Sequence, residues 1–600
     1  MSRAGETTAP AAANRTGRGL GYMPGIDGLR TVAVVAVVIY HLGATWLPGG
    51  YLGVDVFLVI SGFLITSLLL AEHRASGRID LRRFWFRRAR RLLPAVLLML
   101  TVVLAVMVLA HPDEVGRLRG QVVAALAYVI NWHFIFADVP YFEQFGRPSV
   151  LLHLWSLAIE EQFYLVWPPL LALGLVALGR RALLLAVGLA AAGSTALAWV
   201  LWEPFTDPSR IYYGTDTRAV ALLVGVGLAL LPAAVRGGAS LTGPRRRAME
   251  GLGWLGAAGV LVAFLSLGDV DERLYRGGFL LVALATAGLV AVAADSSSFI
   301  GRLLGTAPLV WLGLLSYGIY LWHWPVIMLT RPDVDIPLEG APLVVLRLAL
   351  TLGAAYLSYR FVEAPFRRYG IRGVREALAK WDVGRPARIA TVSSVAIALT
   401  GLALAVALTP ARSSSVPGLT DIAPARGQAE ASPTSADGEG GRLPRLLFVG
   451  DSVMLVASSE LRRAFGSRAV VDAAAGRRFP EGADIAMGHL RALPNDTVVI
   501  IHLGNNYFID PRELDSLLDR LSKRPRILLL TVRVPLPWQD SVNDAIHKVP
   551  ARHANVSVVD WHARSGGPGL LVDGAHMSER GMRLYAETIS GALGEDRSRR

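Results

Sequence analysis

Short blocks in the last quarter of the chain carry side chains suited to nucleophilic catalysis. Ser452 follows the β-rich run RLLFV within the block Gly450-Asp451-Ser452 and precedes an apolar segment. A serine at such a strand-to-helix turn lies at the carboxyl end of a parallel sheet, where open α/β folds place their sites. The helix N-terminus there would also stabilise negative charge. By itself the block is more typical of an ordinary turn, so its interpretation depends on the blocks that follow.

The remaining components of a catalytic serine site occur further along the chain. Asp573 and His576 lie just before the last helix-like segment, Gly476 follows the strand-like run VVDAAA, and Asn505-Asn506 follow VVIIHL. A serine nucleophile needs a base, and the base needs a carboxylate that holds its tautomer. Glycine N–H groups and asparagine side chains are suitable oxyanion donors. The chain therefore holds every component of a Ser–His–Asp site.

In this order and spacing, the blocks resemble the SGNH hydrolase superfamily over roughly 445–595. The resemblance implies that Ser452 is the nucleophile, His576 the base and Asp573 its orienting carboxylate. The family's Gly-x-Asn spacing selects the second asparagine of the pair, so the implied oxyanion donors are Ser452 N–H, Gly476 N–H and Asn506. Three other residues suit a sugar-binding groove and equally suit a buried core: Trp538, Asn543 and Trp561.

The elements that must position these residues form a small α/β domain, predicted over 444–595. Its runs LLFVG, VVIIHLG, ILLLTV and VSVVD are β-rich and alternate with helix-like segments such as 510–523 and 578–593. Strands that alternate with helices indicate a three-layer fold with a parallel sheet. The preceding stretch, 410–443, is rich in Pro, Ser, Gly, Ala and Thr, which predicts a flexible linker.

The larger part of the chain is much more apolar. Mean hydropathy is +0.44, and 53% of residues are hydrophobic while only 18% are charged, below the charge of an ordinary soluble domain. Runs of membrane-spanning length predict a polytopic helical domain over 22–370, a cytoplasmic loop over 371–388 and one more span, following a disordered tail over 1–21. The eleven predicted spans are 31–47, 52–71, 93–110, 151–177, 182–202, 217–235, 250–267, 278–294, 308–329, 342–362 and 389–409.

The distribution of charge predicts the orientation. The net charge of +13 comes from Lys and Arg that gather in alternate loops between the apolar runs. This pattern favours a cytoplasmic N-terminus, an extracytoplasmic C-terminal domain and a multi-pass protein of the cell membrane over nucleic-acid binding. The segment 121–137 could be a further span, but its polar residues favour an external or interfacial helix. The absence of cysteine excludes thiolate catalysis and Cys-ligated metal sites, and no metal motif is evident.

Polar residues inside predicted spans are functional candidates because they are costly in a bilayer. Arg30 precedes His41 by eleven residues, about 16 Å along a helix, so Arg30 is expected at the cytoplasmic mouth and His41 deep in the first span. Glu160 and Glu161 are expected at a similar depth, where a carboxylate could orient the imidazole. A structural hydrogen bond of the histidine and a solvated carboxylate pair remain the alternatives.

A basic segment, RRFWFRRARR, is predicted to be a cytoplasmic loop. Its arginines include Arg87, Arg88, Arg90 and Arg91. Guanidinium clusters suit phosphate binding, although ordinary positive-inside charge explains part of the pattern.

Six separated segments in this half resemble the acyltransferase-3 family of integral membrane acyltransferases over about 22–370. They are GLRTVAVVAVVIYH, DVFLVISGFLIT, RRARRLLPA, LLHLWSLAIEEQFYLVWP, SYGIYLWHWPV and RFVEAPFRR. The family's Arg-x10-His pattern matches Arg30 and His41, its acidic motif matches Glu160 and Glu161, and its Phe-x-x-x-Ser-Gly-Phe-Leu stretch begins at Phe57. Its basic motif matches Arg87, Arg88, Arg90 and Arg91.

Members of that family modify lipopolysaccharide, peptidoglycan and other glycosides, often with a fused SGNH domain. The resemblance therefore implies an O-acyltransferase that binds no cofactor. Acyl-CoA, most simply acetyl-CoA, would donate through the arginines and His41, and Ser452 would pass the acyl group to an external glycan. Direct transfer from the membrane domain, a membrane-tethered esterase, and a transporter with an inert external domain are the alternatives.

Overall fold

The computed structural model describes residues 21–137, 139–141, 148–231, 244–332, 335–370, 444–536 and 538–594. Contacts divide the chain into two compact units, of which the second comprises residues 203–207 and 413–600. The predicted cytoplasmic loop, the predicted span over 389–409 and the predicted linker lie outside the described residues, as do the first 20 residues of the predicted tail.

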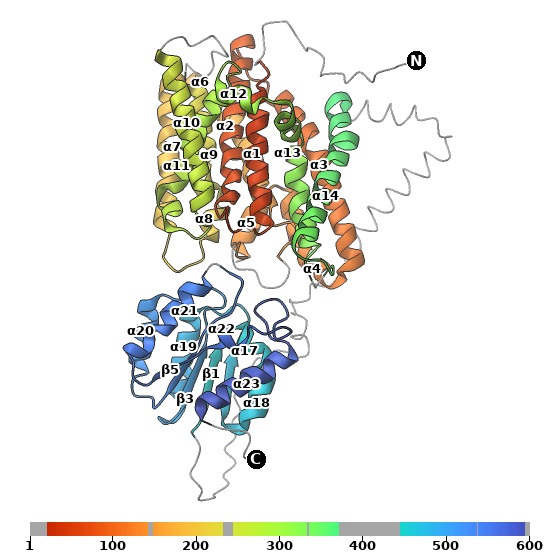
Figure 1. The fold of residues 1–600 in the computed structure, drawn as a ribbon. Coiled ribbons are helices and arrows are strands. Elements are labelled where there is room, and N and C mark those ends of the chain that lie inside the picture. The colour runs from red at the N-terminus through yellow and green to blue at the C-terminus, as the bar shows by residue number, and fades with distance from the viewer. Residues whose placement is uncertain are drawn as a thin grey trace, which may run out of the picture. The chain divides into compact units, whose positions relative to one another are not determined.

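The first unit is helical (Figure 1). Ten of the predicted spans correspond to helices: α1 (Pro24–His41), α2 (Gly53–Ser76), α3 (Leu81–Ala110), α6 (Leu154–Ala177), α7 (Gly179–Leu201), α9 (Thr215–Leu230), α10 (Pro244–Ser266), α11 (Phe279–Ala293), α13 (Ala307–Met328) and α14 (Gly340–Ser358). Shorter helices connect them: α4 (Pro112–Leu126), α5 (Ile130–Phe136), α8 (Ser209–Tyr213) and α12 (Phe299–Leu304). Within the described ranges, seven helical stretches are long and apolar enough to cross a membrane. These findings confirm a polytopic helical domain.

Several helices begin earlier than predicted, and the difference is largest for α1 and α3. α1 starts at Pro24, because proline is favoured in the first helical turn, and it ends at His41. His41 is therefore the last residue of its helix and does not lie in the middle of a span. α3 starts at Leu81, where the Asp80 side chain accepts a 2.9 Å hydrogen bond from the Arg83 N–H. The basic segment predicted as a loop is thus helical.

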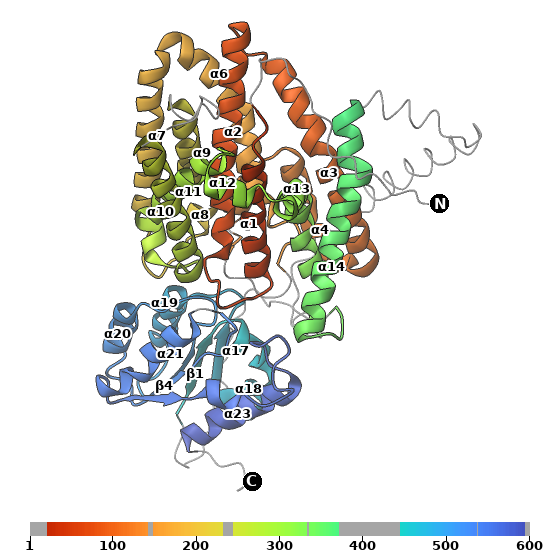
Figure 2. The same cartoon turned by 45° about the horizontal axis from the view of Figure 1, so that its top comes forward.

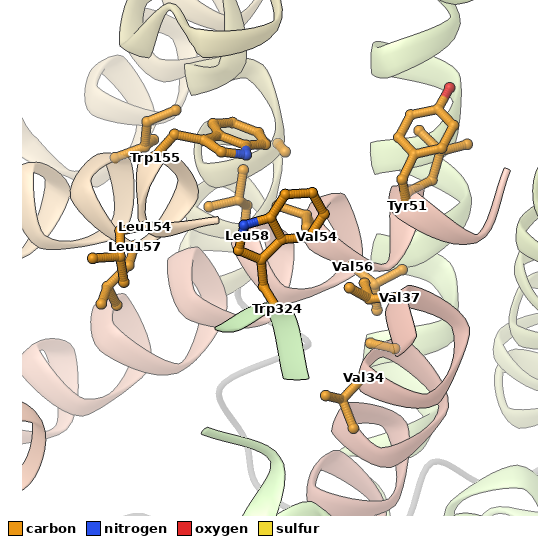
Figure 3. Packing of buried hydrophobic residues seen from close by; sticks show 14 of the residues in the cluster. Val34, Val37, Tyr51, Val54, Val56, Leu58, Leu154, Trp155, Leu157 and Trp324 are labelled. Carbon is orange, nitrogen blue, oxygen red and sulfur yellow. The ribbon is translucent and has the colours of Figure 1, made fainter. Parts of the chain in front are cut away.

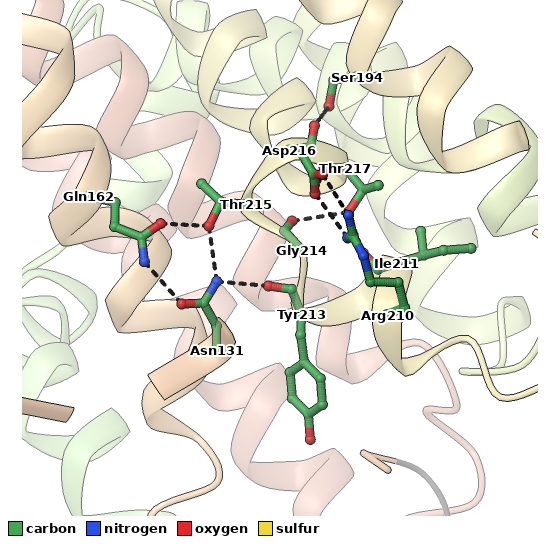
Figure 4. Close-up of polar contacts among 10 residues, drawn as sticks. All are labelled: Asn131, Gln162, Ser194, Arg210, Ile211, Tyr213, Gly214, Thr215, Asp216 and Thr217. Carbon is green, nitrogen blue, oxygen red and sulfur yellow. Dashed lines mark hydrogen bonds and ion pairs between the residues drawn. The ribbon is translucent and has the colours of Figure 1, made fainter. Parts of the chain in front are cut away.

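The segment 121–137 does not form one continuous helix. α4 ends and α5 begins within it, and Tyr128 between them has a positive φ of 55°. The Gln162 side chain holds this break by donating to the Tyr128 carbonyl at 2.8 Å and to Asn131 Oδ1 at 3.0 Å. Asn131 in turn donates to the Tyr213 carbonyl at 3.0 Å (Figure 4). These polar bonds satisfy the backbone where the helix is interrupted.

The interior of this unit combines packed aromatic and aliphatic side chains with very close helix contacts. Trp155, Trp324 and Val34 belong to one buried cluster (Figure 3). α2 and α9 lie side by side (Figure 2), and their backbones come close together at two glycines. A Cβ added at Gly62 would lie 2.1 Å from the Leu222 carbonyl oxygen, and one added at Gly225 would lie 2.1 Å from that of Val59. Small residues allow such contact between membrane helices.

We expect Gly62→Val to destabilise the protein because α2 and α9 would have to separate. Overpacking of a well-packed interior typically costs about 1–3 kcal/mol, and here the obstacle is backbone, which cannot rotate away. Thermal unfolding in detergent should show a clearly lower Tm. Gly188→Val is the matched control, since a Cβ at Gly188 on α7 meets nothing within 4 Å. An unchanged Tm for Gly62→Val would contradict the close contact.

The second unit contains a parallel sheet with strand order β2-β1-β3-β4-β5. Its strands are β1 (Leu446–Gly450), β2 (Ala469–Ala473), β3 (Val498–His502), β4 (Ile527–Leu530) and β5 (Val556–Val559). Its helices are α17 (Ser452–Val456), α18 (Ser458–Phe465), α19 (Phe479–Leu490), α20 (Pro511–Arg520), α21 (Gln539–His547), α22 (Trp561–Arg564) and α23 (Glu579–Leu593). Every residue of β1, β3 and β4 is buried, as expected when helices cover both faces. The predicted α/β fold is confirmed.

Candidate catalytic sites

Ser452, His576 and Asp573 form one hydrogen-bonded chain in the second unit. Ser452 is the first residue of α17, directly after β1, and its Oγ lies 3.0 Å from His576 Nε2. His576 Nδ1 lies 2.7 Å from Asp573 Oδ2, while Asp573 Oδ1 accepts the His576 N–H at 2.7 Å. A carboxylate only accepts, so it keeps the proton on Nδ1 and leaves Nε2 basic toward the serine. This arrangement can activate a serine for acyl transfer.

Burial and hydrogen bonding act in opposite directions on the two acids near the serine. Burial would raise the pKa of Asp573, but hydrogen bonds and the charge of His576 hold that pKa below its usual value. Burial has the larger effect at Asp451, although the charge of His576 also acts on that carboxyl. Its burial raises its pKa to about 6, although the Asn505 side chain donates to it at 3.0 Å and the Val453 N–H at 3.0 Å. Asp573 is therefore the carboxylate that stays charged beside the base.

The raised pKa of Asp451 predicts a measurable pH dependence of stability. Between its unfolded pKa near 4 and its folded pKa near 6, the folded protein binds a proton that the unfolded chain releases, so stability falls as pH rises. The loss is on the order of 2–3 kcal/mol for a shift of this size. In Asp451→Asn this slope should disappear, because the amide cannot ionise. Urea unfolding of the second unit at pH 4–7, wild type against variant, checks this, and Asp573 contributes equally to both proteins. Parallel curves for the two proteins would contradict the raised pKa.

The candidate oxyanion donors come from the loops after β2 and β3, on either side of the loop that carries Ser452. Gly476 has a φ of 72°, a left-handed conformation that glycine adopts without strain. Asn506 donates one amide hydrogen to the Arg477 carbonyl at 3.0 Å, which leaves its second hydrogen for a ligand. The side-chain amide of the neighbouring Asn505 instead donates to the carboxylate of the buried Asp451. Asn506 is thus the asparagine whose geometry suits an oxyanion.

A second candidate site lies inside the helical unit, around a cavity of about 90 Å³. Its lining combines three arginines with polar residues of α2, α6 and α13, among them Arg30, Arg88, Arg91, Ser61, Ser156, Glu160, Tyr164, Ser316 and Tyr320. The Glu160 carboxylate accepts hydrogen bonds from the hydroxyls of Ser61 and Tyr164. Arg88 packs over the Tyr164 ring, 4.9 Å from its centroid. The three guanidinium groups of this cavity suit a phosphate-bearing ligand.

His41 has a different set of neighbours. Its Nδ1 lies 3.1 Å from His323 Nε2, and its Nε2 lies 3.4 Å from the Tyr141 hydroxyl. Trp324 packs edge-on against it, with ring centroids 5.0 Å apart. Among the described residues, neither Glu160 nor Glu161 hydrogen-bonds to His41. The expectation that a carboxylate of this pair orients the imidazole is therefore wrong, and a second imidazole occupies that place.

Comparison with protein families decides the classification. The model described as "Acyltransferase domain" matches residues 23–360. The chain belongs to this acyltransferase family. The peptidoglycan O-acetyltransferase OatA of Listeria monocytogenes is 36% identical, with 95% of this chain and 98% of the relative covered. The O-acetyltransferase OatA of Staphylococcus aureus is 33% identical, with 95% of each chain covered. The family assignment inferred from the motifs is confirmed.

Solved structures give a match to the second unit. The C-terminal catalytic domain of Streptococcus pneumoniae peptidoglycan O-acetyltransferase A, solved with a methylsulfonyl adduct, matches with 22% identity and a TM-score of 0.23. The match covers 25% of this acyltransferase and 93% of that chain.

Two of the predicted donor-binding arginines of this acyltransferase do not line the cavity. Arg87 is exposed and pairs with Glu72 at 3.3 Å, while Arg90 donates to the Phe366 carbonyl at 3.3 Å. Arg88 and Arg91 do line it, because residues three apart share one face of a helix. Helical rather than loop structure therefore separates the four arginines into two groups.

Three aromatic and polar residues predicted as an alternative sugar groove are buried in the core of the second unit. Trp538 and Trp561 are 0% exposed. The Asn543 side chain forms two hydrogen bonds with the Val532 backbone, at 2.8 and 2.9 Å. The groove interpretation is therefore wrong for all three residues, because apolar burial outweighs the exposure that a sugar would need.

Sequence reasoning missed several polar residues of the acyltransferase's helical unit. His323 and Tyr141 contact His41, and Ser61 and Tyr164 bind Glu160. A signal existed for His323, which is a histidine within an apolar run. Glu161, which the sequence does single out, has a buried Oε1 without a hydrogen-bond partner among the described residues.

Proposed function

We propose that this protein transfers an acetyl group from cytoplasmic acetyl-CoA to hydroxyls of peptidoglycan on the outer side of the membrane. One observation carries the proposal: the chain combines an arginine-lined intramembrane cavity with a complete Ser–His–Asp arrangement. The names of the relatives, which match over both halves, support acetyl transfer to peptidoglycan over an esterase or a transporter.

The donor binds at the cavity in the helical unit. Arg30, Arg88 and Arg91 hold the phosphates of acetyl-CoA, because guanidinium groups pair strongly with phosphate oxygens. The pantetheine arm extends along α13, whose residue Tyr320 lines the cavity and whose backbone leads on to His323 beside His41. His41 acts there as the base or as the transient acyl carrier.

The acceptor reaction takes place at Ser452. Its Oγ attacks the carbonyl carbon of the donor's acetyl group while His576 Nε2 takes the proton of the serine hydroxyl. His576 then gives this proton to the departing donor group, which leaves the acetyl group on Ser452. A sugar hydroxyl then attacks the acyl-enzyme, gives its proton to His576, and the proton returns to Ser452 as the ester bond breaks. Ser452 N–H, Gly476 N–H and Asn506 stabilise the oxyanion. Overall, a thioester is exchanged for a sugar ester and free CoA thiol.

This assignment places the N-terminus in the cytoplasm and the second unit outside, in agreement with the charge distribution of the sequence. The donor must then be presented on one side of the membrane and the glycan on the other.

Transfer of label from acetyl-CoA to glycan in membranes tests the function, and an arginine pair sharpens the test. Arg91→Ala should raise the KM for acetyl-CoA by roughly tenfold or more, since a hydrogen bond to a charged group contributes about 1.5–3 kcal/mol. Arg87→Ala removes the same charge from the same helix but outside the cavity, and should change KM far less. Equal effects of the two variants would refute the cavity as the donor site, and no transfer of label by the wild type would refute the function.

A further inference from the structure

The environment of His323 fixes where its protons lie. His323 is fully buried on α13, and its Nδ1 lies 2.6 Å from the Tyr320 carbonyl oxygen. A carbonyl oxygen only accepts, so Nδ1 of His323 carries a hydrogen. In the neutral ring, the other nitrogen then holds a lone pair. That nitrogen, Nε2, is the one 3.1 Å from His41 Nδ1.

The same reasoning then applies to His41. Because His323 Nε2 accepts, His41 Nδ1 must donate, and the lone pair of a neutral His41 lies on its Nε2. Nε2 faces the Tyr141 hydroxyl at 3.4 Å. Charging either ring would place a cation in the interior within 5.1 Å of a second imidazole, which is costly without a counter-charge. The neutral pair therefore has one consistent arrangement of protons.

Hydrogen bonds fix α13 at three residues next to His323. The Tyr320 hydroxyl donates to the His153 carbonyl at 2.8 Å, and His153 Nε2 lies 3.1 Å from the Leu321 carbonyl oxygen. The Trp324 indole donates to the Ser149 carbonyl at 2.8 Å. These bonds tie α13 to the segment preceding α6 and to its start, so the acceptor nitrogen presented to His41 has a fixed position.

We propose that His323 is a positioning residue that accepts the Nδ1 proton of His41 and thereby makes Nε2 the reactive nitrogen of His41. The inference rests on the proposed role of His41 as base or acyl carrier. His323 does not touch the substrate. It takes the place that a carboxylate has in a Ser–His–Asp site, but as a neutral acceptor it adds no charge to the interior of the membrane.

The test compares three substitutions of His323 in the full-length protein in membranes, with kcat and the KM for acetyl-CoA measured per folded protein. His323→Leu removes the acceptor, and kcat should fall roughly 10–100-fold, as for residues that orient other functional histidines, with little change in KM. His323→Gln places an amide oxygen near the former Nε2 and should restore most of kcat. His323→Asn keeps the polarity but is too short to reach His41, so it should resemble His323→Leu.

The rescue distinguishes positioning from packing, because a packing role alone would not separate glutamine from asparagine. Wild-type kcat in both His323→Leu and His323→Asn, or equal losses in the glutamine and asparagine variants, would overturn the inference. Near-normal transfer by His41→Ala would instead refute the underlying role of His41, so the two failures are distinguishable.

Discussion

Ser452→Ala should abolish acetylation of the glycan by the full-length protein. The hydroxyl 3.0 Å from His576 Nε2 is the proposed acyl acceptor, and losing one member of such a triad typically lowers kcat by several orders of magnitude. Quantifying ester-linked acetate on peptidoglycan from cells with and without the variant measures the effect. A small remainder is expected from oxyanion stabilisation and binding alone.

Ser565→Ala is a suitable control for that experiment. Ser565 is also a buried serine of the second unit, but its hydroxyl donates to the Trp561 carbonyl at 2.7 Å and lies outside the triad. It should leave acetylation close to wild type. If Ser452→Ala acetylates the glycan normally, the acyl group does not pass through Ser452, and the second unit at most presents the acceptor.

His41→Ala should abolish transfer from acetyl-CoA while the protein still accumulates in the membrane. His41 ends α1, so alanine preserves the helix and removes only the imidazole that contacts His323 and Tyr141. Loss of a general base alone costs about 10²–10⁴-fold, and loss of an acyl carrier should cost more. Transfer of labelled acetate in membranes, normalised to protein abundance, measures this effect.

His73→Ala provides the comparison, since His73 lies in the last turn of α2 and does not line the cavity of the helical unit. It should transfer acetate normally. A well-expressed His41→Ala with near-normal transfer would remove His41 from the mechanism. A parallel loss of abundance and activity in His41→Ala would indicate a structural histidine.

The site of the second unit could be predicted although Ser452 and His576 are 124 residues apart, because short motifs and the topology of a parallel sheet determine where its parts lie. Asp573 and His576 are three residues apart and share hydrogen bonds within one turn. Ser452 and Asn506 follow β1 and β3, and parallel strands bring the residues at their carboxyl ends to one edge of the sheet. Strand order and short loops therefore place these groups together without any knowledge of tertiary contacts.

The membrane site was less predictable because its contacts join distant parts of the chain. His323 is 282 residues from His41, and Ser61 is 99 residues from Glu160. The spacing of apolar and polar residues within one helix does not predict contacts between such distant residues. The basic segment forms a helix because the Asp80 side chain caps its start, and the prediction of a loop does not take this cap into account. With the helix in place, Arg88 and Arg91, three residues apart, would have been expected on one face.

The close contact between α2 and α9 also bears on the width of the cavity in the helical unit. Ser61 lines the cavity, and the adjacent residue, Gly62, sets how near α9 can approach. A larger side chain at Gly62 or Gly225 would push the helices apart and widen the space beside Ser61. In the proposed function, the fit of the phosphate-bearing end of the donor would then depend on backbone separation as well as on the side chains that line the cavity.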